Sequence, residues 1–206
     1  ALRAIDVEGL QLDRLHNDTT SRLVFGAYNH PDAPDTISIT YGHSKDQRPD
    51  LKQVMYGLST TTDGVPVNAQ LLSGNTSDKT WNSDLLAELK KNLRLDPQAT
   101  LHYVGDSALV TQRNLDLAAA NGIVLTSRMP RTLTATTTAL VRAAHEPLTM
   151  TPLGTFSEAK DATSYEGCVL PDCEVLGHRV QLGVFRATPA KDRKSTRLNS
   201  SHVALS

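Results

Sequence analysis

The sequence has few cysteines and no long apolar run. Its two cysteines, Cys168 and Cys173, are too few for a disulfide scaffold, so a reducing compartment is expected. No stretch approaches the roughly 20 apolar residues of a membrane span, and no secretory signal is present. We therefore expect a cytoplasmic protein without a membrane partner. The chain also begins without methionine, at Ala1, which predicts that its true start is missing.

The sequence also lacks a strong net charge. Its formal charge is −1 over 206 residues, a length that suits one domain or one domain plus part of another. Residues 191–206 hold four of the 21 basic residues and one of the 22 acidic ones, so 17 basic and 21 acidic residues remain without them. Contacts with nucleic acid must therefore come from local clusters or metal ions, because no global positive field is present.

The first half of the chain reads mainly as strands. Strands are predicted over residues 15–21, 22–28 and 36–41, forming an antiparallel meander. A hairpin of residues 53–60 and 65–72 is predicted around Asp63-Gly64. A helix over residues 81–93 follows, with Ser77 or Asp78 as its cap.

The middle of the chain alternates strands and helices. An apolar run from Leu101 ends abruptly in Gly105-Asp106-Ser107, which is typical of a buried strand that delivers a carboxylate to a sheet edge. A helix over residues 111–120, stopped by Asn121-Gly122, and a strand over residues 123–127 follow. This alternation predicts an α/β fold with parallel strands in the sheet.

The remaining chain changes character after residue 131. Residues 132–146 are predicted to be partly helical, and residues 163–169 and 178–188 to be strands across a turn near Pro171-Asp172 and Gly177. The expected organisation is a lead-in (1–14), a core (15–131), a β-containing insertion (132–190) and a non-native or disordered tail (191–206).

Two aspartates are the main candidates for chemistry. Asp18, in Leu15–Ser21, and Asp106 are each predicted to sit at the end of a strand, and they converge if these strands are neighbours. Two carboxylates a few ångströms apart repel each other unless a cation or a shared proton compensates. Mg²⁺ is suited to such a site, and two ions about 3.5–4 Å apart can drive phosphodiester cleavage. For either aspartate alone, a helix-capping or turn-forming role is the alternative.

Other polar clusters have several interpretations. The loop from His43 to Lys52 has three interpretations. It could bind a metal through His43, Asp46 and Asp50, although their spacing fits no common motif, or contact phosphate through Lys45, Arg48 and Lys52. It could also be a solvated loop whose charges pair with one another. Arg128 and Arg131 suit either a phosphate contact or solvent. The spacing of Cys168, Cys173 and His178 is not a good zinc pattern. His16 and His102 beside the two strands are usually structural, and Ser107 lacks a nucleophile elbow.

Several longer strings carry a family resemblance. They are LHNDTTS, TYGHSKDQRPDLKQ, DGVPVNAQLLSGNTSDKTW, YVGDSALVTQRNL and LTSRMP, in unbroken order from Leu12 to Arg131. Together they resemble the core of bacterial insertion-sequence transposases of the DDE class, the IS-four-like family. The resemblance implies an RNase H-like mixed sheet flanked by helices, with a β-rich insertion.

The resemblance also implies a function. Asp18 matches the family's first acid and Asp106 its second, and three acids together hold two Mg²⁺ (or Mn²⁺) ions that drive end cleavage and strand transfer on double-stranded DNA. Lys45, Arg48, Lys52, Arg128 and Arg131 are then the candidate DNA contacts, and a homodimer on paired ends is expected. The protein would act in a bacterial cytoplasm, at the nucleoid.

The third acid of the family, a glutamate on a helix after the insertion, has no match here. Glu158, Glu166 and Glu174 fall within the insertion and are not assigned to it. The sequence thus predicts a transposase fragment that is inactive alone. The alternatives are an RNase H-like nuclease and a non-catalytic DNA-binding remnant of a mobile element.

Overall fold

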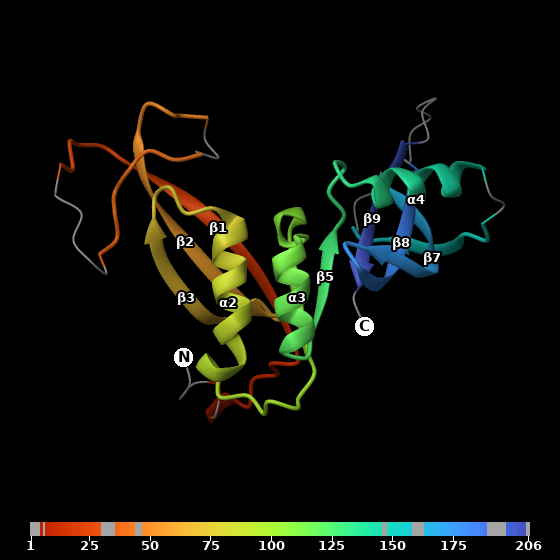
Figure 1. Ribbon diagram of the computed structural model, residues 1–206, viewed down its shortest axis with the longest axis horizontal. Coiled ribbons are helices and arrows are strands. Elements are labelled where there is room, and N and C mark those ends of the chain that lie inside the picture. Colours follow the sequence, from red (N-terminus) through yellow and green to blue (C-terminus); the bar gives the residue numbers. More distant parts are fainter. Residues whose placement is uncertain are drawn as a thin grey trace. The chain divides into compact units, whose positions relative to one another are not determined.

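The computed structural model describes residues 5, 7–29, 36–43, 47–145, 148–157, 163–188 and 197–204. The chain divides into two compact units, Ala1–Ile123 and Val124–Ser206. The strand β5 (Ile123–Arg128) starts at this division and pairs with a strand of the second unit. The division therefore falls before the end of the core that the sequence suggests, which was residue 131. Figure 1 shows the elements of both units.

The first unit is built on a mixed sheet. Its strands β1 (Arg14–Val24), β2 (Lys52–Thr61), β3 (Pro66–Ser73) and β4 (Leu101–Gly105) lie in the order β3-β2-β1-β4. The pairs β3–β2 and β2–β1 are antiparallel, and β1–β4 is parallel. The α/β class and the parallel pairing expected from the sequence are confirmed for this unit.

Two helices cover one face of this sheet. They are α2 (Asp78–Asn92) and α3 (Gln112–Ala120), which lie side by side in Figure 1. Ser77 caps α2 by accepting a hydrogen bond from the Thr80 backbone N–H, as the sequence predicts. The covered face holds the apolar core of the unit, which includes Leu15, Trp81, Leu85, Leu86, Leu89, Leu101, Tyr103 and Leu115.

The predicted three-strand meander at the start of the chain is wrong. Residues 14–24 form one continuous strand, because buried and exposed residues alternate without a turn between the two predicted pieces. The strand ends before Gly26 and Tyr28, whose backbones have positive φ. In the third predicted piece, only Thr40 makes a β-bridge, to Gln53.

The second unit is an antiparallel sheet with one helix. Its strands β6 (Thr151–Thr155), β7 (Ser164–Val175), β8 (His178–Thr188) and β9 (Arg197–Ala204) join β5 in the order β5-β9-β8-β7-β6. The helix α4 (Thr134–His145) packs on β7, β8 and β9. Inward residues of β8, including Leu182 and Val184, are fully buried. A partly helical segment followed by strands matches the expectation for this region.

Two details of the second unit differ from the sequence interpretation. Pro171-Asp172 is not the turn of the hairpin but lies at a bulge within β7, and the turn is made by Leu176 and Gly177, both with positive φ. Residues 197–204 of the expected tail form β9. Backbone pairing does not depend on side-chain periodicity, so a polar segment can still form a strand. No helix among the described residues is long and apolar enough to span a membrane.

The contact between Gly57 and Trp81 tests the packing of the first unit. A Cβ added to Gly57 would lie 2.3 Å from Cε2 of Trp81, whose indole N–H is held by Gln70 Oε1 at 2.8 Å. We expect Gly57→Ala to lower the free energy of unfolding by about 1–3 kcal/mol through overpacking. Urea denaturation measures this, and Ala69→Ser on the exposed face of β3 is the control. Equal stability of the two variants would contradict the packing.

Candidate active site

Asp18 lies in the middle of β1 and not at its end. Leu15, Asn17, Thr19 and Ser21 are buried on the helix-covered face, so Asp18 projects from the opposite, exposed face. The prediction that Asp18 ends a strand was wrong, because β1 continues to Val24. The buried polar residues beside Asp18 form hydrogen bonds with other elements and do not end the strand. Thr19 donates its hydroxyl to the Asp78 carboxylate, and Asp18 Oδ1 accepts the Thr19 backbone N–H at 2.8 Å.

Asp106 follows the last residue of β4, as the sequence predicts. It caps a short 3₁₀ turn, η1 (Ser107–Leu109), by accepting the Ala108 backbone N–H at Oδ1, at 3.0 Å. The capping role that was the alternative for this aspartate is therefore present. It also fixes the carboxylate at the end of the strand, on an exposed side chain.

The strand register brings the two aspartates together. Arg14 pairs with His102 and His16 with Val104, an offset of 88 residues. Asp18 and Asp106 are separated by the same 88 positions (106 − 18), so they would lie opposite each other if this pairing, which ends at His16 and Val104, continued for two more residues. Both line a pocket of about 400 Å³ in the first unit, together with His16, Asn17, Leu58, Thr60, Val104 and Gly105.

A buried polar layer supports this pocket from the covered face of the sheet. Tyr103, three residues before Asp106, donates its hydroxyl to Asn82 Oδ1 on α2 at 2.5 Å. Asn114 on α3 accepts from Ser83 at 2.6 Å and donates to the Leu109 carbonyl at 3.0 Å, at the end of η1. Both helices are thereby hydrogen-bonded to the residues that flank the second aspartate.

Tyr103 is the buried ionisable group of this layer. Burial raises the pKa of its phenol well above its usual range, and the negative charge of Asp106 adds to the shift. The hydroxyl therefore stays protonated and acts as a donor. Its hydrogen bond to Asn82 is the partner that a buried tyrosine requires.

The donor chemistry of the pocket suits a hard divalent cation in part. Carboxylate oxygens are the ligands that Mg²⁺ prefers, and this ion keeps several waters in its shell. Within the described part of the chain, no group of three or more His, Cys, Asp or Glu side chains is placed to hold a metal. The pocket therefore supplies two acids, and the described residues add no third.

The candidate DNA contacts in the first unit have internal partners. Arg48 forms a bidentate pair with Asp50, at 2.8 and 2.6 Å, which raises the pKa of Arg48 and lowers that of Asp50. Lys52 bonds the carbonyls of Ala27 and Tyr28. Lys45 and Asp46 lie outside the described residues. The ion pair between Arg48 and Asp50 agrees with the interpretation of this segment as an internally paired loop.

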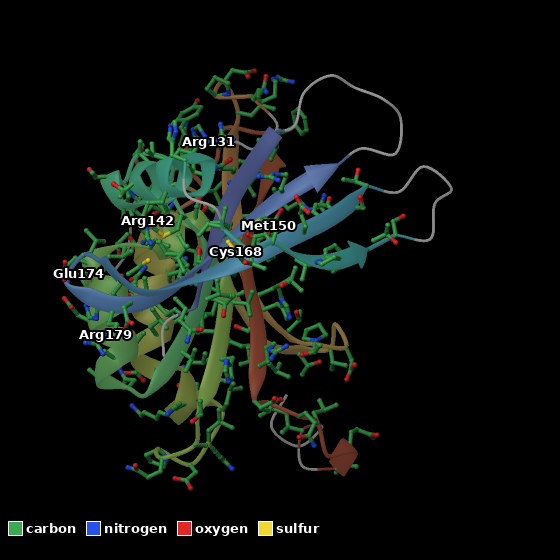
Figure 2. The ribbon with its side chains drawn as sticks, turned by 90° about the vertical axis from the view of Figure 1, so that its right-hand side faces the viewer. Arg131, Arg142, Met150, Cys168, Glu174 and Arg179 are labelled. Atoms are coloured by element: carbon green, nitrogen blue, oxygen red, sulfur yellow. The ribbon has the colours of Figure 1, made fainter. Side chains whose placement is uncertain are left out.

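The remaining candidates belong to the second unit. Arg128 ends β5, and Arg131 lies in the turn before α4, where Figure 2 labels it. Both are exposed, and neither has an ion-pair partner among the described residues.

The two cysteines, Cys168 and Cys173, lie on β7 as thiols (Figure 2 labels Cys168), and burial raises the pKa of both. Glu166 pairs with Arg186 at 3.0 Å.

Sequence reasoning missed several residues of the pocket. His16, Leu58, Thr60 and Val104 line it because they share the exposed face of three adjacent strands. Asn17 was missed as well. The sequence could have indicated it, because an asparagine stands at a position of β1 where the alternation of buried and exposed residues places a buried side chain.

Comparison with solved structures finds distant structural neighbours of this chain. No protein-family profile and no curated protein matches the chain. A solved chain that it resembles is the piggyBac transposase in a cryo-EM structure of a synaptic complex with hairpin DNA, at 10% identity and a TM-score of 0.43. The match covers 90% of this chain and 34% of that one, so this chain spans about a third of the neighbour's length.

The raised pKa of Tyr103 predicts a pH dependence of stability. In the unfolded chain the phenol ionises near its usual value of 10.0, whereas in the folded protein it stays protonated. Stability is therefore fully present below pH 10 and falls as the pH rises above it. Tyr103→Phe should flatten this fall. It should also cost about 1–3 kcal/mol at neutral pH, because Asn82 Oδ1 loses its donor.

Urea unfolding between pH 7 and pH 11 measures both effects. Tyr56→Phe, at an exposed tyrosine on β2, is the control and should leave the alkaline slope unchanged. An alkaline slope that is the same in wild type and Tyr103→Phe would contradict the assignment.

Proposed function

We propose that this chain is part of the catalytic core of a DNA transposase of the DDE class, similar to the IS-four-like insertion-sequence transposases. The observation that carries the proposal is that Asp18, on β1, and Asp106, directly after the parallel strand β4, line one open pocket. These are the two residues that match the first two family acids. The motif strings between Leu12 and Arg131 supply independent support from the sequence.

The proposed fold is RNase H-like. Three antiparallel strands, followed by a strand parallel to the first with helices on one face, are consistent with this fold. In such a sheet the first and fourth strands are neighbours, so acids on them share one site. The β-containing segment after β5 would then be the insertion.

The residues of the chain would bind and orient the cations. Asp18 and Asp106 would supply carboxylate oxygens to Mg²⁺ or Mn²⁺, with Asp106 held by its cap to Ala108. Two bound ions supply activation of a water and stabilisation of the leaving oxygen in phosphodiester cleavage. Tyr103 and Asn114 keep the strand end and the following turn in place. With two acids only, we expect weak metal binding and very low activity of this chain by itself.

The proposed partners follow from the same assignment. The substrate would be double-stranded DNA, as transposon ends and target, with a homodimer on paired ends in a bacterial cytoplasm. Arg128 and Arg131 are exposed and have no ion-pair partner in the described part of the chain, whereas the Lys52 ammonium donates to the carbonyls of Ala27 and Tyr28. They are therefore better suited to phosphate than Arg48, which is paired with Asp50.

Mn²⁺ binding tests the acid pair. Electron paramagnetic resonance titration of the purified chain should show a bound ion, and Asp18→Asn or Asp106→Asn should weaken binding by more than about tenfold. Asp84→Asn, an exposed aspartate on α2, is the matched control. An unchanged affinity in both pocket variants, or no binding by the wild type, would contradict the proposed site.

Assays on DNA separate the proposal from its alternatives. With Mg²⁺ and duplexes carrying the element's own ends, we expect very little nicking by this chain. Efficient nicking that Asp106→Ala abolishes would show that two acids suffice. Hydrolysis without strand-transfer products would favour a nuclease, and metal-independent DNA binding unaffected by Asp18→Ala and Asp106→Ala would favour a non-catalytic remnant.

The salt dependence of DNA binding tests the arginines. Fluorescence anisotropy with a labelled duplex should show weaker binding of the double variant Arg128→Ala/Arg131→Ala. Its log–log salt slope should be smaller by about 1 for each lost phosphate contact. Arg48→Ala is the matched control, and we expect its slope to equal that of the wild type. A larger effect of Arg48→Ala would assign the DNA contact to the loop instead.

A further inference from the structure

Asn17 occupies the position where β1 and β4 stop pairing. The parallel pairing of the two strands ends at His16 and Val104, one residue before Asn17 and two before Asp18. Asn17 itself lines the pocket, although its side chain is 6% exposed and lies on the covered face. It is therefore a buried side chain directly next to Asp18 in β1 that also reaches the pocket.

The amide of Asn17 joins the two strands at this point. Its Nδ2 donates to the Leu15 carbonyl on β1 at 3.0 Å and to the Val104 carbonyl on β4 at 3.4 Å. One NH₂ group with two hydrogens thus bonds both backbones.

A row of buried polar side chains crosses the sheet at Asn17. Asn17 is in register with Ser59 on β2, and Ser59 with Asn68 on β3. Asn17 Oδ1, Ser59 Oγ and Asn68 Nδ2 are all buried without a hydrogen-bond partner among the described residues. The Asn17 side chain is therefore held by its NH₂ group, which bonds the carbonyls of Leu15 and Val104.

We propose that Asn17 is a positioning residue that clamps β1 to β4 and so holds Asp18 and Asp106 at the separation needed to bind one divalent cation between them. The inference rests on the proposed function for its metal, but the clamp itself is a property of the two strands. Asn17 donates to the carbonyls of Leu15 and Val104, three residues before Asp18 and two before Asp106, and it acts through these strands.

The test uses two readouts on the full chain. Asn17→Leu keeps the volume and removes the donor, and Asn17→Ser, too short to reach Val104, serves if the first variant does not fold. We expect hydrogen–deuterium exchange of the peptide covering residues 101–109 to become roughly three- to tenfold faster. Mn²⁺ affinity, followed by electron paramagnetic resonance, should fall by about tenfold.

The control is Ser21→Ala. Ser21 is buried on the same face of β1 and has no hydrogen-bond partner for its hydroxyl among the described residues. A purely structural effect of altering a buried polar residue in β1 would appear in both variants. We expect Ser21→Ala to leave Mn²⁺ affinity and exchange of residues 101–109 at wild-type values.

The outcomes separate the inference from the proposed function. Unchanged exchange and unchanged Mn²⁺ affinity in the Asn17 variants, while Asp18→Asn abolishes binding, would overturn the clamp and leave the metal site standing. Faster exchange in the Asn17 variants, with no Mn²⁺ binding by the wild type, would support the clamp and overturn the proposed function. Equal effects of Ser21→Ala would overturn the positioning role.

Discussion

The parallel pairing of β1 with β4 is the constraint on which the rest of the candidate site depends. It is short, with three residue pairs, and its offset equals the separation of Asp18 and Asp106 in the sequence. Two carboxylates brought together in this way repel each other at neutral pH unless a cation compensates. The sheet therefore has to hold two like charges on its exposed face, and the hydrogen bonds on its covered face oppose their separation.

Those covered-face bonds form a polar layer in a place where most sheets are apolar. Asn17, Thr19, Tyr103 and Asn114 are all buried, and each donates or accepts across elements. Each unsatisfied buried group costs about 1–3 kcal/mol, and Asn17 Oδ1 is such a group among the described residues, so the bonds that this layer does form have to offset that cost. In return it specifies one arrangement of strands and helices, since polar partners are directional and apolar ones are not.

Much of the first unit could be predicted from the sequence. The hairpin at Asp63-Gly64, both helices with their caps and the strand before Asp106 follow from local turn residues and apolar spacing. β1 could not be bounded correctly, because the polar run around Asp18 looks like the end of a strand. In the structure, the Thr19 hydroxyl and the Asn17 amide in this run hydrogen-bond to residues far along the chain, Asp78 and Val104.

Only part of the candidate site could be predicted, because it too depends on pairing between residues far apart in the sequence. Asp18 and Asp106 were identified from their motifs, but their adjacency depends on a strand register that no local pattern contains. His16 and Asn17 become part of the pocket only through that register. In the second unit, β6 and β9 were missed because their pairing is carried by backbone groups and their side chains show no clear alternation.

The separation of 88 positions between the two aspartates also favours one order of folding. The β2–β3 hairpin and α2 lie within that interval and form from contacts close in sequence, whereas the β1–β4 pairing closes the whole loop. Contacts of long sequence separation form late, because the chain entropy of closure must be lost before they contribute. During synthesis, β1 is therefore expected to pair with β2 first, and its other edge pairs only after β4 has been made. We expect the pocket to be among the last features of the unit to assemble.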